Sequence, residues 1–162
     1  MKGSADTLAA ISKLDDLCPA GYAIALHISF SAPKFLFQTY DRDWIDKYSE
    51  LGLVLHDPTV RWGFENVGII NWEDLKESDE AGVLKQAEAY GIRFGFTLAL
   101  DRNGSKSITS FARDDREFLQ VEIDEISEIV DALHVDTADI EAFSSEALEQ
   151  LKKMSVQFTH AE

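Results

Sequence analysis

A β-hairpin centred on the residues Asp-Arg-Asn-Gly at positions 101–104 constrains the fold more than any other feature of the chain. An Asn-Gly pair favours a tight hairpin turn, because both residues tolerate positive φ angles. Before the turn, Phe94, Phe96, Leu98 and Leu100 alternate with Gly95, Thr97 and Ala99, which is typical of a strand with two different faces. Residues 105–113 are expected to return as the partner strand, so the fold contains an antiparallel sheet.

Two more strands are predicted near the N-terminus. Residues 22–30 alternate in hydropathy, and residues 35–37 follow a turn at Pro33 as an adjacent strand. The apolar face of the first strand is expected to comprise Tyr22, Ile24, Leu26, Ile28 and Phe30.

Helical periodicity appears in the intervening and flanking segments. Helices are predicted over residues 4–17, from Asp41 or Asp43 to Gly52, from Asp57-Pro58 onward, from Ser78 to Tyr90, from residue 114 onward and over residues 145–158. The inward face of the helix after residue 114 is expected to comprise Phe118, Leu119, Ile123, Ile126, Val130 and Leu133. Neighbouring strands with helices before, between and after them predict an α/β (α+β) fold in which helices cover an antiparallel sheet.

Length and composition indicate one globular domain. The chain has 162 residues, of which 45% are hydrophobic, enough to bury a core around a ligand. No apolar run approaches the roughly 20 residues that span a bilayer. Lys13, Asp15 and Asp16 interrupt the N-terminal segment, which excludes a signal peptide, and the single cysteine, Cys18, fits a reducing compartment. We therefore expect a cytoplasmic protein.

The charge balance argues against direct contact with nucleic acid. Thirty acidic residues against 15 basic residues give a net charge of −15. DNA affinity depends mainly on Lys and Arg side chains that neutralise phosphates, and no basic stripe is present. The chain is therefore not expected to bind DNA by itself.

Residues 40–72 concentrate large side chains that carry polar tips. Tyr40, Trp44 and Tyr48 recur every four residues and share one helical face, Asp57-Pro58 opens the next helix, and Trp72 follows a short apolar run. Taken singly, each feature has an ordinary explanation, because such aromatics usually pack in cores and Asp-Pro is usually a helix cap. Together they form the pattern Y-x3-W-x3-Y-x8-D-P-x-V-x11-W.

This pattern resembles the signal-binding domain of LuxR-type quorum-sensing regulators, which bind N-acyl homoserine lactones. The resemblance implies an α-β-α sandwich with a central antiparallel sheet of about five strands. It implies that Asp57 accepts a hydrogen bond from the ligand amide, that Trp44 donates to the lactone carbonyl and that Tyr40 donates to the acyl carbonyl. Burial makes such partners necessary, since each unpaired polar group costs roughly 1–3 kcal/mol.

The resemblance extends to further positions of the chain. Ser110 matches a serine that can contact the acyl carbonyl, Gly95 matches a characteristic glycine, and Thr97 matches a position whose hydroxyl supports the aspartate. The pocket wall is expected to include Tyr48, Val60, Trp72 and Leu36. The chain has Ile69 and Ala99 where relatives usually have proline, which affects backbone rigidity and leaves the acyl-chain preference open.

Enzymatic and metal-binding alternatives find little support in the sequence. The four histidines are scattered without metal-ligand spacing, and Cys18 has no evident catalytic partner. No glycine-rich phosphate loop occurs. We expect no catalytic residues, no metal and no cofactor.

The sequence therefore predicts a signal-sensing domain over residues 1–162, with the DNA-binding helix-turn-helix domain of such regulators absent from this chain. We expect a homodimer, no membrane contact, and DNA contact only through that missing C-terminal domain. With Asp57 unpaired, the empty protein is expected to be loosely folded. A stand-alone domain that pairs with and inhibits a full-length regulator, or a different small amide or ester ligand, remains an alternative.

Overall fold

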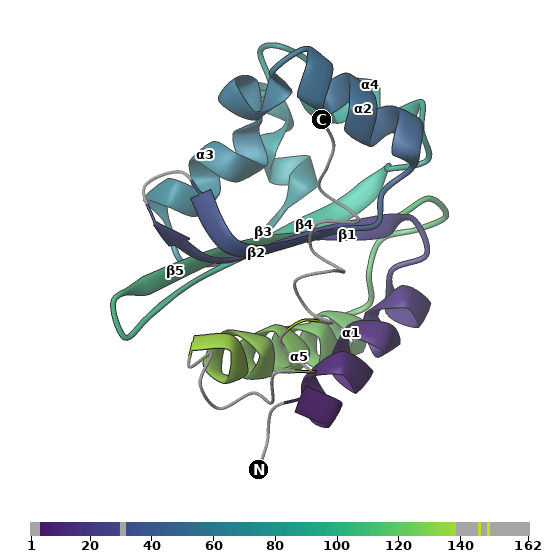
Figure 1. The fold of residues 1–162 in the computed structure, drawn as a ribbon. Helices are drawn as coiled ribbons and strands as arrows, with labels where there is room; N and C mark the ends of the chain where they lie inside the picture. Colours follow the sequence, from purple (N-terminus) through teal and green to yellow (C-terminus); the bar gives the residue numbers. More distant parts are fainter. Residues whose placement is uncertain (1–3, 30–31, 139–145, 147–148, 150–162) are drawn as a thin grey trace.

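A computed structural model describes residues 4–29, 32–138, 146 and 149, with side chains described from Ala9 onward. Its centre is a five-stranded antiparallel sheet in the order β2-β1-β5-β4-β3, with helices on both faces (Figure 1). The elements are α1 (Ser4–Leu17), β1 (Gly21–Ser29), β2 (Ala32–Gln38), α2 (Arg42–Glu50), η1 (Leu53–His56), α3 (Pro58–Glu65), β3 (Gly68–Asn71), η2 (Trp72–Ser78), α4 (Val83–Glu88), β4 (Phe94–Arg102), β5 (Ser105–Arg113) and α5 (Gln120–Ala138). The predicted fold class is confirmed.

The predicted hairpin is formed by β4 and β5. The two strands pair without a register shift from Phe94 opposite Arg113 to Arg102 opposite Ser105. At the turn, Asn103 and Gly104 have φ angles of 55° and 75°, the left-handed region that an Asn-Gly pair adopts readily. The hairpin thus supplies two adjacent strands of the sheet.

The main hydrophobic core lies between one face of the sheet and helices α1 and α5 (Figure 1). The fully buried side chains there include Leu14 from α1, Ile24 from β1, Phe111 from β5 and Ile126 from α5. Leu119 was expected on this inward face, but it is 53% exposed because α5 begins only at Gln120 and Leu119 belongs to the preceding loop.

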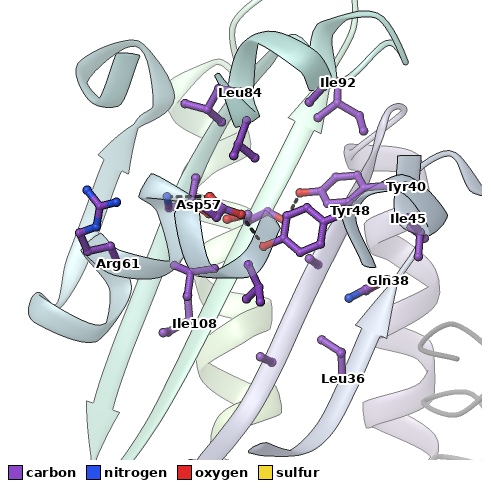
Figure 2. Close-up of a pocket in the computed structure, with 18 of the residues that line it drawn as sticks. Leu36, Gln38, Tyr40, Ile45, Tyr48, Asp57, Arg61, Leu84, Ile92 and Ile108 are labelled. Carbon is purple, nitrogen blue, oxygen red and sulfur yellow. Dashed lines mark hydrogen bonds between the residues drawn. The ribbon is translucent and has the colours of Figure 1, made fainter. Parts of the chain in front are cut away.

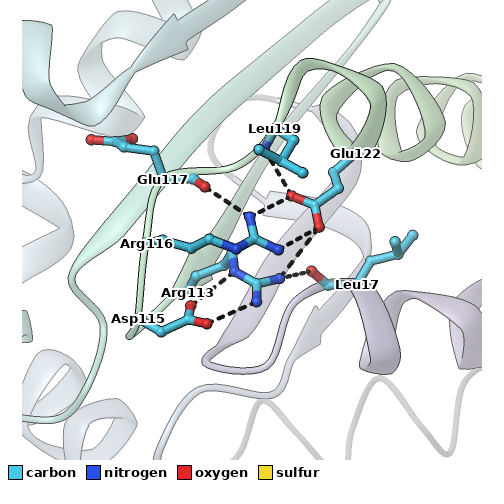
Figure 3. Close-up of polar contacts among 7 residues, drawn as sticks. All are labelled: Leu17, Arg113, Asp115, Arg116, Glu117, Leu119 and Glu122. Atoms are coloured by element: carbon cyan, nitrogen blue, oxygen red, sulfur yellow. Dashed lines mark hydrogen bonds and ion pairs between the residues drawn. The ribbon is translucent and has the colours of Figure 1, made fainter.

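A polar cluster of side chains fixes the start of α5 (Figure 3). The Glu122 carboxylate accepts a 2.8 Å hydrogen bond from the Leu119 amide and two more from the Arg116 guanidinium. Arg113 at the end of β5 lies 3.7 Å from the same carboxylate. These contacts, led by the Arg116 hydrogen bond, lower the pKa of Glu122 to about 2. The cluster therefore anchors α5 to the end of the sheet.

Strand β1 changes face at a bulge. The register shifts between Ala25 and Ile28, and His27 has a φ angle of 56°, in the left-handed region. Ile28 was expected to share a face with Tyr22 and the other inward residues of the strand. The bulge instead turns Ile28 to the opposite face, where it lines a cavity.

The opposite face of the sheet is covered by α2, η1, α3, η2 and α4 (Figure 1). The expected single helix from Ser78 to Tyr90 is wrong, because η2 ends at Ser78 and α4 begins at Val83. The Asp79 carboxylate accepts hydrogen bonds from the amides of Val83 and Leu84, and Gly82 adopts a left-handed conformation with φ of 70°. The Asp79 carboxylate therefore caps the first turn of α4, whereas Ser78 belongs to η2.

Strand β3 was not predicted as a separate element. Its four residues pair with β4 from Gly68 opposite Ala99 to Asn71 opposite Phe96, and they complete the sheet edge. The predicted helix over residues 145–158 lies almost wholly outside the described residues. Within the described part of the chain, none of the helices combines the length and apolarity that crossing a membrane requires.

Candidate ligand-binding site

A cavity of about 640 Å³ lies between the sheet and the helices of the second face (Figure 2). This volume falls within the range of small-molecule pockets in proteins. Eight of the nine residues proposed from the sequence line it: Leu36, Tyr40, Trp44, Tyr48, Asp57, Val60, Trp72 and Ser110. The ninth, Thr97, does not line the cavity but hydrogen-bonds to two residues that do, Trp72 and Ser110.

Asp57 is the N-cap of α3, and both of its carboxylate oxygens accept hydrogen bonds. Its Oδ1 accepts bonds from the Thr59 amide at 2.9 Å and the Thr59 hydroxyl at 2.7 Å, and its Oδ2 accepts one from the Tyr48 hydroxyl at 2.7 Å. The expectation that Asp57 is unpaired is therefore wrong. Burial still raises the pKa of this carboxyl, although its hydrogen bonds act in the opposite direction.

Two tyrosine hydroxyls face the region around Asp57 (Figure 2). Burial raises the pKa of both phenols well above the usual value, so each remains protonated and can donate. The Tyr48 hydroxyl donates a hydrogen bond to Asp57, whereas the Tyr40 hydroxyl donates to the Ser110 carbonyl over 3.4 Å. That length is at the weak end of hydrogen bonding, so the Tyr40 hydroxyl can turn to a stronger acceptor at low cost.

Trp44 projects from α2 into the same cavity and is 4% exposed. Its ring packs edge-on against Tyr48 at 5.8 Å between centroids and in a tilted arrangement against Tyr90 at 5.5 Å. Among the described residues, its indole N–H forms no hydrogen bond. Packing thus fixes the ring and leaves a free donor at the cavity.

The resemblance implied that the Thr97 hydroxyl supports Asp57, but the structure shows other partners for it. Its hydroxyl accepts a 3.0 Å bond from the Trp72 indole and lies 2.7 Å from the Ser110 hydroxyl. Thr97 therefore orients Trp72 and Ser110, while Thr59 and Tyr48 hold the aspartate. Gly95, two residues before Thr97 on β4, lets the Trp72 ring lie directly on the sheet, because a Cβ there would be 2.6 Å from the indole.

The floor of the cavity is a trough along β1. Ala23 lies opposite Gln38 of β2 and opposite Ser110 of β5, which places one small side chain between two polar ones. Two residues further along the strand, Ala25 lies between Leu36 and Ile108. Residues two positions apart on a strand share one face of the sheet. The trough is therefore polar across Gln38, Ala23 and Ser110, and it is apolar across the next row, which contains Leu36.

Several lining residues were not identified from the sequence, including Ala23, Ala25, Ile28, Gln38, Ile45, Val54, Leu55, Thr59, Arg61, Phe64, Leu84, Ile92 and Ile108. Two of them carried a usable signal. Thr59 lies two residues after the capping Asp57, where a hydroxyl and an amide can both reach the carboxylate. Ile108 lies two residues before Ser110 on the same strand and therefore shares its face.

Within the described ranges, no group of three or more His, Cys, Asp or Glu side chains is placed to hold a metal ion. Cys18 is buried on the other side of the sheet, where burial raises the pKa of its thiol to about 12. The site is thus an apolar chamber with a few oriented donors and one carboxylate, an arrangement typical of a small-molecule receptor.

Comparison with known proteins assigns the chain to a family. The model of the autoinducer binding domain matches residues 20–136, so the chain belongs to this LuxR-type, non-enzymatic family. The transcriptional activator SolR of Ralstonia nicotianae is 26% identical over 113 residues, which cover 69% of this chain and 48% of SolR. The chain thus spans about half the length of that relative.

Solved structures show the same fold. CepR2 of Burkholderia cenocepacia, described as an N-acylhomoserine lactone-dependent LuxR family transcription factor, has a TM-score of 0.60 at 19% identity, covering 83% of this chain and 87% of that one. Escherichia coli SdiA has a TM-score of 0.61 at 21% identity, covering 96% of this chain and 65% of SdiA. A complex of SdiA with octanoyl-rac-glycerol has a TM-score of 0.59 at 19% identity, covering 89% and 64%.

Proposed function

We propose that this domain binds an N-acyl homoserine lactone in the cavity between the sheet and α2, η1, α3 and α4. The observation that carries the proposal is the pairing of a buried carboxylate, Asp57, with an unengaged indole donor, Trp44, on one apolar chamber. An acyl homoserine lactone offers one amide N–H and two carbonyl groups beside an aliphatic tail. The chamber offers an acceptor and donors in matching number.

The hydrogen bonds within the site support the polar roles that the family resemblance implies. Asp57 accepts from the amide N–H, since a carboxylate oxygen can accept a further bond beside those from Thr59 and Tyr48. Trp44 donates to the lactone carbonyl. Tyr40 exchanges its 3.4 Å bond to the Ser110 backbone for the acyl carbonyl. The tail then lies along the trough, over the apolar row that contains Leu36.

We further propose that the domain senses this signal in the cytoplasm for a LuxR-type transcription regulator. Occupancy would stabilise the folded domain, by about 2.7 kcal/mol at a hundredfold excess of ligand over its dissociation constant. In this scheme the domain forms a homodimer, for which a two-fold interface is the default, and contact with DNA belongs to a separate helix-turn-helix domain. The net charge of −15 supports that division of labour.

Thermal denaturation of the domain with a panel of acyl homoserine lactones tests the proposal. At least one lactone is expected to raise the melting temperature of the parent, and Asp57→Asn and Trp44→Phe are expected to reduce that rise. Asp124→Asn, which alters an exposed carboxylate of α5 on the opposite side of the sheet, is the matched control and should respond like the parent. The ligand assignment is wrong if no lactone stabilises the parent protein.

The SdiA complex makes a monoacylglycerol a useful second probe. Octanoylglycerol has an ester oxygen where the lactone has its amide N–H, so it offers no donor at that position, and its two hydroxyl donors lie further from the acyl carbonyl. If the parent binds the lactone through that contact, Asp57→Asn should weaken the lactone much more than octanoylglycerol. Equal losses for the two ligands would argue that Asp57 only caps α3, and would favour a different amide or ester as the natural ligand.

A further inference from the structure

Gln38 is a polar lining residue for which the proposed lactone contacts give no role. It ends strand β2, is half-buried, and lines the cavity. Among the described residues its side-chain amide forms no hydrogen bond. Figure 2 shows this amide directed from β2 toward the middle of the pocket, between Tyr48 and Leu36.

Apart from Arg61, which is exposed on α3, the other polar side chains that line the cavity are already engaged or assigned. Thr59 and Tyr48 bond to the carboxylate, and Ser110 bonds to Thr97. A ligand that covered Gln38 with a plain alkyl chain would remove water from the side-chain amide without providing a hydrogen-bond partner, which is unfavourable. A pocket for a simple tail would be better served by an apolar residue, such as Leu36 two positions earlier on the same face.

The register of the sheet locates Gln38 along the bound ligand. Gln38, Ala23 and Ser110 lie side by side on β2, β1 and β5, so the backbones of Gln38 and Ser110 are roughly 10 Å apart at the usual strand spacing. The intervening Ala23 leaves the space between them open. In the proposed complex, Tyr40 turns from the Ser110 carbonyl to the acyl carbonyl of the ligand, which therefore lies close to Ser110. The Gln38 amide then faces the part of the acyl chain next to that carbonyl.

We propose that Gln38 is a specificity-determining residue that recognises a hydrogen-bonding substituent at carbon 3 of the acyl chain, so that 3-oxoacyl or 3-hydroxyacyl ligands are preferred over unsubstituted ones. This inference rests on the proposed lactone-binding function. The glutamine N–H can donate to a keto or a hydroxyl oxygen, and its carbonyl can also accept from a hydroxyl. The apolar row beyond it then receives only hydrocarbon.

The experiment measures dissociation constants for N-acyl, N-(3-oxoacyl) and N-(3-hydroxyacyl) homoserine lactones of matched length, as octanoyl and dodecanoyl series. The parent is expected to bind a substituted ligand about 3- to 10-fold more tightly than the unsubstituted one, the usual effect of one net hydrogen bond. Gln38→Leu should abolish or reverse that preference. Gln38→Glu, whose ionised side chain only accepts, should retain hydroxy binding and lose oxo binding.

Gln120→Leu is the matched control, because Gln120 is exposed at the start of α5 and distant from the cavity. Circular dichroism and melting of each unliganded variant separate loss of recognition from loss of fold. An unchanged preference in a folded Gln38→Leu variant that still binds lactones overturns the role of Gln38 and leaves the proposed function intact. If no lactone binds the parent, both the function and the role of Gln38 are wrong.

Discussion

The Tyr48 hydroxyl donates a 2.7 Å hydrogen bond to Oδ2 of Asp57, and this bond connects α2 to the first turn of α3 across the cavity. The two residues are nine positions apart in the chain. A carboxylate in an apolar setting needs such a donor, because an unpaired buried charge is costly. The bond therefore belongs both to the helical layer and to the wall of the pocket.

Removing this donor should destabilise the unliganded domain. Tyr48→Phe leaves one carboxylate oxygen without its buried partner, and we expect a loss of about 1–3 kcal/mol in the free energy of unfolding. Urea denaturation measures the change. Tyr90→Phe is the control, since Tyr90 also packs against Trp44 but its hydroxyl forms no hydrogen bond among the described residues. Equal losses in the two variants would contradict a specific role for the Tyr48 hydroxyl.

Asp57 should make the empty domain less stable as the pH rises. Its pKa is raised in the folded state by burial, so the folded form favours the protonated carboxyl. The corresponding stability is present at acid pH and is lost as the pH rises through the folded-state pKa. Denaturation at a series of pH values should show a weaker decline toward neutral pH in Asp57→Asn than in the parent. A parallel decline in both proteins would exclude Asp57 as its source.

Two buried histidines should produce the opposite pH dependence. The rings of His27 and His134 lie 4.3 Å apart, and burial is the main cause that lowers the pKa of both. Stability is therefore present above the unfolded-state pKa of about 6.5 and is lost as the pH falls through the folded-state values. Melting temperatures over this range should fall less in His134→Gln than in the parent. His56→Gln, at an exposed position outside this pair, is the control substitution.

Gly95 and Gly63 should respond differently to alanine. A Cβ on Gly95 would lie 2.5 Å from the backbone oxygen of Phe111 and 2.6 Å from the Trp72 ring, so Gly95→Ala should cost about 1–3 kcal/mol. A Cβ on Gly63 would lie 2.6 Å from Cγ2 of Ile108, which must move, but its three nearest neighbours are side-chain atoms and not backbone, and Ala is the better helix former in α3, so a smaller loss is expected. Denaturant titration compares the two. An equal or larger loss for Gly63→Ala would contradict the proposed difference.

The sequence predicted those features that depend on local patterns. Alternation and the Asn-Gly turn identified β4 and β5, and the Asp-Pro pair identified the start of α3. The spacing of Trp44 and Asp57 located two groups that the structure brings to one cavity. Their function as ligand contacts stays a prediction.

Other features depended on contacts that are distant in the chain. The support of Asp57 by Tyr48 requires the relative placement of two helices. The partners of Thr97 lie on η2 and β5, so its local pattern gave no means of choosing them over Asp57. The bulge at His27 is stabilised by hydrogen bonds to residues more than 75 positions away, so the face of Ile28 could not be read from alternation. At His27, long-range hydrogen bonding overrode the local alternation of the strand.

At the bulge, the neighbouring residues His27 and Ile28 contact opposite sides of the sheet. The His27 ring hydrogen-bonds to the backbone of His134 in α5 at 2.8 Å, while Ile28, the next residue, borders the end of the trough. A displacement of one residue must move the other, because only a peptide bond separates them. A ligand group that displaced Ile28 would therefore also strain the hydrogen bond by which His27 holds α5.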